Sequence, residues 1–261
     1  MRVSFVIPSR NQASFIGRCV DSCLAQGIPD SEVLVVDGAS TDGTQEILAG
    51  FGDRIAWTSE RDGGQADAVN KGVARARGEI IAWINSDDRY EDASVVREVL
   101  AAFAADPRRD VVYGDGLTVD ALDRPLRPYR TRVITAPREA LLHPSSVSLQ
   151  PATFFRRQLF LDAGGLRTDL HYALDYELWL RMLPLARAIH HVPRTLARAT
   201  YHAGAKSVAG MWRQIRETVA VKREYQGRFA LGLRERLELE AGIASLYAYG
   251  AAVRLGLKRA A

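Results

Sequence analysis

The stretch IIAWINSDD at residues 80–88 decides the fold of this 261-residue chain. Five apolar residues follow one another and end on Asn85-Ser86-Asp87-Asp88, which includes two adjacent carboxylates. A short, unbroken apolar run of this kind is typical of a parallel strand that is covered on both faces. The stretch therefore predicts a buried strand with acidic side chains at its carboxyl end.

Two earlier apolar runs repeat this pattern. Residues 3–7 lead into PSRN at 8–11, and residues 33–36 lead into DGAS at 37–40. Helical patterns follow the strands, at residues 15–25, 44–49, 65–76 and 94–105. Strand-helix alternation predicts an α/β fold with an open, mostly parallel, Rossmann-like sheet. Because ligands bind beyond the carboxyl ends of such strands, we expect the three polar strand ends to meet in one crevice.

The second half of the chain is less regular. A strand is predicted at 111–113, helices at 154–163 and 176–185, and short strands at 188–192 and 196–201, while residues 115–150 show no clear periodicity. From about residue 211 the chain reads as helical. We therefore expect a single catalytic domain over residues 1–210, with a helical C-terminal appendage over 211–261. The domain divides into a regular half, residues 1–115, and a less regular half, residues 116–210.

Composition indicates an ordinary globular protein, with 47% apolar and 25% charged residues. Cys19 and Cys23 lie four residues apart in a helical pattern, which favours two buried apolar residues over a metal or redox pair. The apolar run at the amino terminus is too short for a signal peptide, and no segment reaches the roughly 18 apolar residues of a membrane span. A cytoplasmic protein is therefore expected.

The net charge of +4 is concentrated in the tail. Residues 211–261 contain ten Lys or Arg and five Glu, a balance of +5, so the rest of the chain balances at −1. This distribution argues against a nucleic-acid-binding face on the main domain. The apolar segment 241–257 with its basic residues predicts either peripheral contact with the inner face of the cell membrane or packing. Packing would be against the domain itself or against a second subunit of a homodimer.

The adjacent carboxylates Asp87 and Asp88 need a partner, because two like charges at one strand end repel each other. A hard divalent ion, Mg²⁺ or Mn²⁺, commonly binds one or two carboxylates together with substrate phosphates. Such an ion would stabilise the charge that develops on a leaving diphosphate. The alternative is a solvated Asp-Asp turn that caps the next helix.

Other polar residues support a ligand site, each with a structural alternative. Asp37 could accept hydrogen bonds from a ribose or a base, or organise a turn. The Gly63-Gly64 step allows close approach of the backbone to a ligand. Lys71 could reach the crevice from its helix, or lie solvated on the helix surface. Asp175 could act as a general base toward an acceptor hydroxyl, or cap the helix that follows it.

Seven motifs together resemble family 2 glycosyltransferases. In order along the chain they are IPSRNQASFI, VVDGASTDGT, SERDGGQADAVNKG, GEIIAWINSDD, QPATFFRR, LHYALDYELWLRM and YHAGAKS. The resemblance covers roughly residues 1–207 and implies the GT-A fold, with residues 1–115 as the nucleotide-sugar-binding half and residues 116–210 as the acceptor-binding half. It is closest to bacterial members that build cell-surface polysaccharides.

The resemblance implies a role for each matching residue. Pro8, Ser9, Asn11, Asp37, Asp62, Lys71 and Asp87 correspond to nucleotide-sugar contacts. Asp88 corresponds to the metal ligand, and His202 to a histidine that helps to bind the metal or the diphosphate. Asp175 corresponds to the general base, and Gln150, Thr153 and Phe154 to the acceptor pocket. The chain departs from the family in reading Ser-Asp-Asp at the metal motif and Leu174 where many relatives carry an acid.

The expected function is therefore inverting hexosyl transfer from a nucleoside diphosphate donor, with a UDP-sugar favoured. The expected acceptor is a saccharide or a lipid-linked saccharide, and the expected cofactor is Mn²⁺ or Mg²⁺. A non-catalytic nucleotide-sugar-binding scaffold is the main alternative. A sugar nucleotidyltransferase is disfavoured because the loop PSRNQ lacks glycine, and a dinucleotide-dependent oxidoreductase because G-x-G-x-x-G is absent there.

Overall fold

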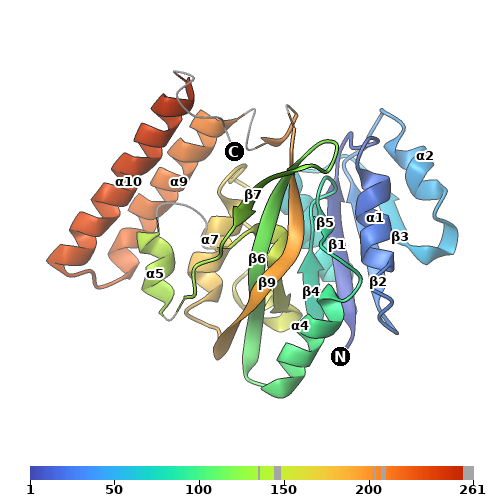
Figure 1. Ribbon diagram of the computed structural model, residues 1–261, viewed down its shortest axis with the longest axis horizontal. Coiled ribbons are helices and arrows are strands. Elements are labelled where there is room, and N and C mark those ends of the chain that lie inside the picture. Colours follow the sequence, from blue (N-terminus) through green and yellow to red (C-terminus); the bar gives the residue numbers. More distant parts are fainter. Residues whose placement is uncertain (135, 144–147, 203, 207–209, 255–261) are drawn as a thin grey trace.

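The computed structural model describes residues 1–134, 136–143, 148–202, 204–206 and 210–254. Within these residues the strands form one nine-stranded sheet with helices on both faces (Figure 1). The strands are β1 (Val3–Ser9), β2 (Glu32–Asp37), β3 (Ala56–Ser59), β4 (Ile80–Trp83), β5 (Arg89–Tyr90), β6 (Arg109–Asp120), β7 (Pro125–Tyr129), β8 (Thr153–Arg156) and β9 (Ala188–Tyr201). The helices are α1 (Ile16–Leu24), α2 (Thr44–Ala49), α3 (Gln65–Arg75), α4 (Val95–Ala105), α5 (Pro137–Leu142), α6 (Arg157–Asp162), α7 (Leu174–Met182), α9 (Met211–Tyr225) and α10 (Leu233–Arg254).

The sheet has the order β3-β2-β1-β4-β8-β6-β9-β5, and β7 pairs with the outer part of β6. Strands β1 to β4, β6 and β9 run in one direction, whereas β5, β7 and β8 run in the other. The prediction of a mostly parallel α/β sheet is therefore confirmed. The sheet also curls, because Tyr90 on its last strand contacts Phe5 on β1, with ring centroids 5.8 Å apart.

The regular first half agrees closely with the sequence prediction. Strands β1, β2 and β4 and helices α1 to α4 lie where the hydrophobic pattern places them, to within two residues at either end. The polar ends of β1, β2 and β4 all lie at the carboxyl edge of the parallel strands. Cys19 and Cys23 are buried free thiols on α1, as predicted.

Most differences between the predicted and the observed elements lie in the second half of the chain. The predicted helix at 154–163 is wrong at its start, because Thr153–Arg156 pairs with both β4 and β6 as strand β8. Residues 188–201 form one strand instead of two, since the pairing with β6 shifts register around Pro193 and then continues. The unassigned region 115–150 contains the end of β6, then β7 and α5. Strands β3 and β5 were not predicted.

Side chains on the two faces of the sheet form two separate apolar clusters, one on each face. Val6, Ile81 and Trp83 pack beneath α3 and α7, whereas the alternate residues Phe5 and Ile80 pack beneath α1 and α4. Gly72 lets α3 approach the sheet closely, because a Cβ atom there would lie 2.4 Å from Val6. The strands are thus covered on both faces, as their unbroken apolar runs predict.

The C-terminal helices belong to the first of these clusters. Val221 and Tyr225 of α9 and Leu239 and Ile243 of α10 are buried with the residues of α5 and α7. In Figure 1, α9 and α10 lie side by side, with α5 and α7 between them and the sheet. The inner face of α10 therefore packs against the domain itself, which is one of the two alternatives predicted for residues 241–257. Contact of its outer face with a membrane or a second subunit stays a prediction. No helix in the described ranges is both long and apolar enough to cross a membrane.

Lys222 of α9 is fully buried beneath α5 and α7. Its ammonium donates hydrogen bonds to the carbonyls of Leu141 and His143, at 2.6 and 2.5 Å, and to the hydroxyl of Tyr176 at 3.0 Å. Burial nevertheless lowers the pKa of Lys222 to about 7. The cause is the loss of hydration, which disfavours the charged form.

This shift makes the stability of the fold dependent on pH. An unfolded lysine has a pKa of about 10.4, so above pH 7 the unfolded chain binds more protons and the free energy of unfolding rises with pH. Relative to Lys222→Met, the wild type should gain about 2 kcal/mol between about pH 7.5 and pH 9.0. Urea unfolding of both proteins at the two pH values measures the gain. A difference that stays constant with pH would contradict the assignment.

Candidate functional site

The ends of β1 and β2 are joined by side-chain hydrogen bonds. The fully buried carboxylate of Asp37 accepts hydrogen bonds from the backbone N–H and hydroxyl of Ser40, and from the hydroxyl of Ser59 at 2.6 Å. Asn11 donates its N–H to the Ser40 hydroxyl at 2.7 Å, and its side-chain oxygen accepts the Thr41 N–H at 3.0 Å. Asp37 thus organises the loop, as the turn alternative describes, and its contact with a nucleotide stays a prediction.

Pro8 and Ser9 lie within β1 and are buried. They pair with Val36 and Asp37 of the neighbouring strand. The Ser9 hydroxyl is buried and has no hydrogen-bond partner among the described residues. The structure therefore places these two residues beside the Asp37 loop, and their nucleotide contacts stay predictions.

Asp62 lies at the start of α3, facing the loop after β2. Its carboxylate accepts the N–H of Gly64 at 2.9 Å. It also lies against Gly38, where an added Cβ atom would be only 2.8 Å from Asp62 Oδ2. The residues predicted from the ends of β1, β2 and β3 are thus brought together, with Gly38 allowing the close approach.

Lys71 lies further along α3 in an acidic environment. Its ammonium forms ion pairs with Asp67 at 3.0 Å and with Glu60 at 3.1 Å, and about a third of its side chain is exposed. These contacts resemble the surface-lysine alternative more than a lysine that points into the crevice. A nucleotide contact by Lys71 would require it to leave one of these acids, and it stays a prediction.

Asp87 and Asp88 follow β4 and meet the end of β9. His202 Nε2 lies 3.2 Å from Asp87 Oδ2, and the His202 ring packs on Phe15 with centroids 4.5 Å apart. The buried Asp88 carboxylate accepts the backbone N–H of Thr200 at 3.0 Å. The two predicted metal-site segments, about 115 residues apart, are therefore adjacent in the fold.

The carboxylate pair has the donor chemistry of a divalent cation site. Burial, together with the charge of Asp87, raises the pKa of Asp88 well above its ordinary value, so a cation here would favour the ionised form. No cluster of three or more acidic, His or Cys side chains suited to a metal occurs in the described part of the chain. Mg²⁺ and Mn²⁺ do not need one, since phosphate oxygens and water complete their coordination. The residues present therefore fit a hard divalent ion bound together with a diphosphate.

A chain of hydrogen bonds leads from this pair toward α7. Asn85 donates to Asp88 at 3.2 Å and accepts from the Gln65 amide at 2.7 Å. The oxygen of Gln65 in turn accepts from the ammonium of Lys206 at 3.1 Å. The positive charge of Lys206 acts on the carboxyl group of Asp175, which links the two ends of the crevice electrostatically.

Asp175 occupies the first turn of α7. The helix begins at Leu174 and the N-cap position is Ala173, so the alternative role of Asp175 as the N-cap is wrong. Its carboxylate accepts the N–H of Tyr176 at 2.8 Å, and no described side chain is hydrogen-bonded to it. Burial raises the pKa of Asp175, and its backbone hydrogen bonds and the charge of Lys206 offset only part of that effect. A half-buried carboxylate with a raised pKa is suited to accept a proton.

A cavity of about 20 Å³ adjoins Asp175, with room for about one water-sized group. Trp83, Gln150 and Thr153 are among the residues that line it. The Trp83 indole N–H and the Gln150 side-chain oxygen are buried without a hydrogen-bond partner among the described residues. A donor and an acceptor are thus available beside the carboxylate, as a hydroxyl group requires.

Phe154 does not belong to this cavity. It is fully buried in the second apolar cluster, on the other face of the sheet, where its ring stacks on Tyr90. Its expected place in an acceptor pocket is therefore wrong, because alternate residues of β8 point to opposite faces.

Gln65, Lys206 and Trp83 have no individual role that local sequence predicts. All three lie inside the quoted motifs, and that membership was the only signal available for them. Their roles depend on contacts between segments that are distant in sequence, such as Lys206 with Gln65 across 141 positions.

Residues 4–163 match the family model described as glycosyl transferase family 2. A relative described as an uncharacterized glycosyltransferase, from Rickettsia felis, is 27% identical over 221 residues, covering 79% of this chain and 36% of its own. This chain therefore spans about a third of the length of that relative.

Two solved structures are similar in fold. Staphylococcus aureus TarS (residues 1–349) in complex with UDP-GlcNAc has a TM-score of 0.69 at 18% identity, covering 99% of this chain and 77% of its own. The mannosyltransferase PcManGT from Pyrobaculum calidifontis, in complex with GDP-Man and Mn²⁺, has a TM-score of 0.64 at 21% identity, covering 97% and 75%. At these identities the likeness shows a shared fold.

Proposed function

This chain belongs to glycosyl transferase family 2, and because it also has the GT-A fold we propose that it is a glycosyltransferase that uses a nucleotide-sugar donor. It transfers a hexosyl unit from a nucleoside diphosphate donor, with a UDP-sugar favoured, to a saccharide or lipid-linked saccharide of the cell surface. The transfer inverts the anomeric configuration. The observation that carries this proposal is the carboxylate pair Asp87-Asp88, which is held against His202 and connected by hydrogen bonds to Lys206, whose charge acts on Asp175.

The donor binds along the carboxyl edge of the parallel strands. Pro8, Ser9, Asn11, Asp37, Asp62 and Lys71 contact the nucleotide in this proposal, and Asp87 lies nearer the ribose. Support comes from the way in which the loops after β1, β2 and β3 are tied together around Ser40 and Gly38. Because these loops are already ordered, little free energy is spent on ordering them when the donor binds.

Asp88 and His202 hold a divalent cation, Mn²⁺ or Mg²⁺, in this proposal. Bound there, the ion supplies Lewis-acid stabilisation of the leaving diphosphate. The chain's contribution is to fix the ligands: the Thr200 N–H and the Asn85 amide orient Asp88, and Phe15 supports the His202 ring. Support also comes from PcManGT, which was solved with Mn²⁺.

Asp175 is the general base. It removes the proton of the acceptor hydroxyl as that oxygen bonds to the anomeric carbon and the bond to the diphosphate breaks. A single displacement from the opposite face inverts the anomeric centre. In this proposal the acceptor hydroxyl reaches Asp175 beside Trp83 and Gln150, two residues of the adjoining cavity whose indole N–H and side-chain oxygen have no hydrogen-bond partner among the described residues.

A donor panel tests the reaction class. We expect the purified protein to release nucleoside diphosphate from one of several UDP-, dTDP- and GDP-sugars with Mn²⁺ and a mixture of saccharide acceptors, and EDTA should abolish the release. Metal-dependent release from one donor would support both the class and the cation. Release that is insensitive to EDTA would contradict the metal site. Calorimetric donor binding with no release from any donor would favour the scaffold alternative.

A further inference from the structure

Helix α9 supports the start of α7 through one carboxylate. Glu217 of α9 accepts hydrogen bonds from three consecutive backbone N–H groups just before the helix: His171 at 2.9 Å, Tyr172, and Ala173 at 2.6 Å. The N-terminal N–H groups of a helix lack partners within it, and a Ser, Thr, Asp or Asn at the N-cap normally supplies one. Glu217 binds the N–H of the N-cap residue Ala173 and those of the two residues before it, so it fixes the chain just ahead of the first turn of α7.

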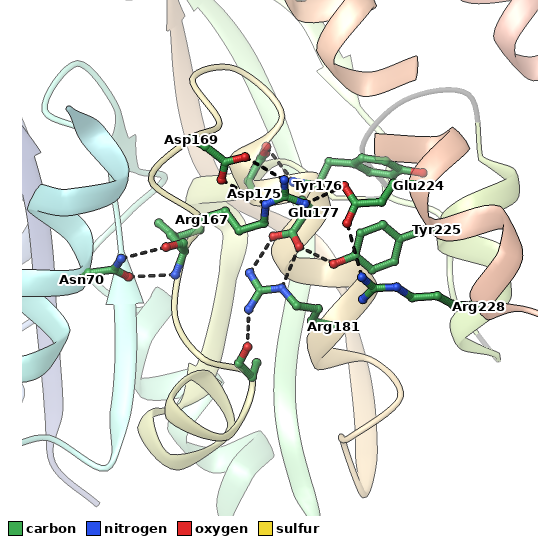
Figure 2. A network of polar contacts seen from close by, with 12 residues as sticks. Asn70, Arg167, Asp169, Asp175, Tyr176, Glu177, Arg181, Glu224, Tyr225 and Arg228 are labelled. Carbon is green, nitrogen blue, oxygen red and sulfur yellow. Dashed lines mark hydrogen bonds and ion pairs between the residues drawn. The ribbon is translucent and has the colours of Figure 1, made fainter. Parts of the chain in front are cut away.

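The residues after Asp175 are also held by α9. The hydroxyl of Tyr225 donates to the buried carboxylate of Glu177, which further accepts two hydrogen bonds from Arg181, at 2.8 and 2.6 Å. The hydroxyl of Tyr176 accepts from Lys222. Figure 2 shows Glu177, two residues after Asp175, between Arg181 and Tyr225. Asp175 is therefore flanked on both sides in sequence by residues that are anchored to α9.

The loop that leads into α7 is anchored as well. Asn70 of α3 makes two hydrogen bonds of 2.8 Å to the backbone of Leu166. Arg167 bridges Asp169 to Glu224 of α9, each at 2.7 Å (Figure 2). The path of the chain from residue 166 to residue 177 is thus fixed by contacts to α3 and α9, whereas Asp175 has no side-chain partner of its own among the described residues.

We propose that α9 positions the catalytic base, with Glu217 as the main positioning residue and Tyr225 and Lys222 as its supports. This inference rests on the proposed role of Asp175. A base must lie within hydrogen-bond reach of the proton that it removes, and a misplacement of about 1 Å can cost about 100-fold in rate. Because the Asp175 carboxylate is left free for substrate, its position has to be set through the backbone, which is where Glu217 acts.

Glu217→Gln tests the inference at nearly constant volume. Glutamine offers one acceptor oxygen to three N–H donors and places an amide N–H₂ where the second oxygen was. We expect turnover per donor-binding site to fall at least about 10-fold, with donor affinity by calorimetry unchanged. Glu238→Gln is the matched control, because Glu238 lies exposed on α10 and away from the site. Equal turnover of the Glu217 and Glu238 variants would overturn the inference.

A double-mutant cycle shows whether Glu217 acts through Asp175. If it does, Glu217→Gln should cause little further loss in the Asp175→Asn background. Two losses that multiply would mean a general structural role and would overturn the positioning role. Full activity of Asp175→Asn alone would instead contradict the proposed base. A loss in Asp175→Asn without a loss in Glu217→Gln would contradict only the present inference.

Hydrogen exchange tests the positioning without any turnover. Amide exchange in peptides covering residues 171–177 should be at least about 10-fold faster in Glu217→Gln than in wild type, because a single acceptor oxygen remains where two oxygens serve three N–H groups in wild type. The Glu238→Gln control should exchange like wild type. Unchanged exchange in the Glu217 variant would show that the carboxylate does not hold this segment.

Discussion

Asp175→Asn is expected to lower turnover at least about 100-fold, which corresponds to about 2.7 kcal/mol of activation free energy. The amide has nearly the same shape but cannot accept the proton of the acceptor hydroxyl. Donor affinity should be unchanged, because the proposed donor site lies at the carboxyl ends of β1, β2 and β4 and does not include Asp175. Initial rates of nucleoside diphosphate release with the donor identified by the panel, alongside calorimetric donor binding, measure the two effects.

The dependence of wild-type turnover on pH provides a second test of the role of Asp175. Burial raises the pKa of Asp175, and the base is active only when ionised. Turnover should therefore fall as the pH drops through that raised value, which lies above the ordinary pKa of about 3.9 for an aspartate. Asp53→Asn, at an exposed position far along the chain, is the control. Retained turnover in Asp175→Asn would refute the assignment.

Asp88→Asn is expected to have an effect of similar size through the cation. Asparagine keeps an oxygen for the Thr200 N–H, so the local fold should persist, but it removes the negative charge that binds a divalent ion. We expect turnover to fall at least about 100-fold and the half-saturating Mn²⁺ concentration to rise. Titration of Mn²⁺ into metal-stripped enzyme at saturating donor measures both quantities.

The same Asp53→Asn variant controls for the loss of one acidic residue. The buried Asp88 carboxylate accepts hydrogen bonds from two donors, so its replacement could also destabilise the fold. Thermal unfolding of Asp88→Asn measures that effect and separates it from a defect in metal binding. A variant that keeps wild-type turnover, Mn²⁺ dependence and EDTA sensitivity would exclude Asp88 from the metal site.

The parallel half of the fold could be predicted because its signals are local. Each of the strands β1, β2 and β4 is an apolar run followed by polar residues, and a helical pattern comes after. Thr153–Arg156 carries no such signal, since two phenylalanines followed by arginines suit a helix as well as a strand. Pairing with β4 and β6 determines that these residues form a strand, and the paired residues are 40 to 76 positions away in sequence.

The candidate site divides in the same way. Asp87, Asp88 and Asp175 could be selected from motifs and from the need for a cation or a base. What could not be predicted is how they are held. The hydrogen bond from the Thr200 N–H to Asp88 cannot be read from local sequence, because any residue except proline has a backbone N–H. The contact of Glu217 with the residues before α7 cannot be read either, because a glutamate on a helix surface is common.

The pairing of Asp88 with Thr200 also bears on when the site forms as the chain is made. The strands β1 to β4 can associate early, since their pairings lie within the first 83 residues. Thr200 and His202 are translated more than 110 residues after the carboxylates that they contact. Until then, two neighbouring negative charges lack the partners that the finished fold gives them. In a nascent chain, the loops after β1, β2 and β3 would therefore form first. The contacts of Asp87 and Asp88 with His202 and Thr200 would form last, once β9 has paired with β6.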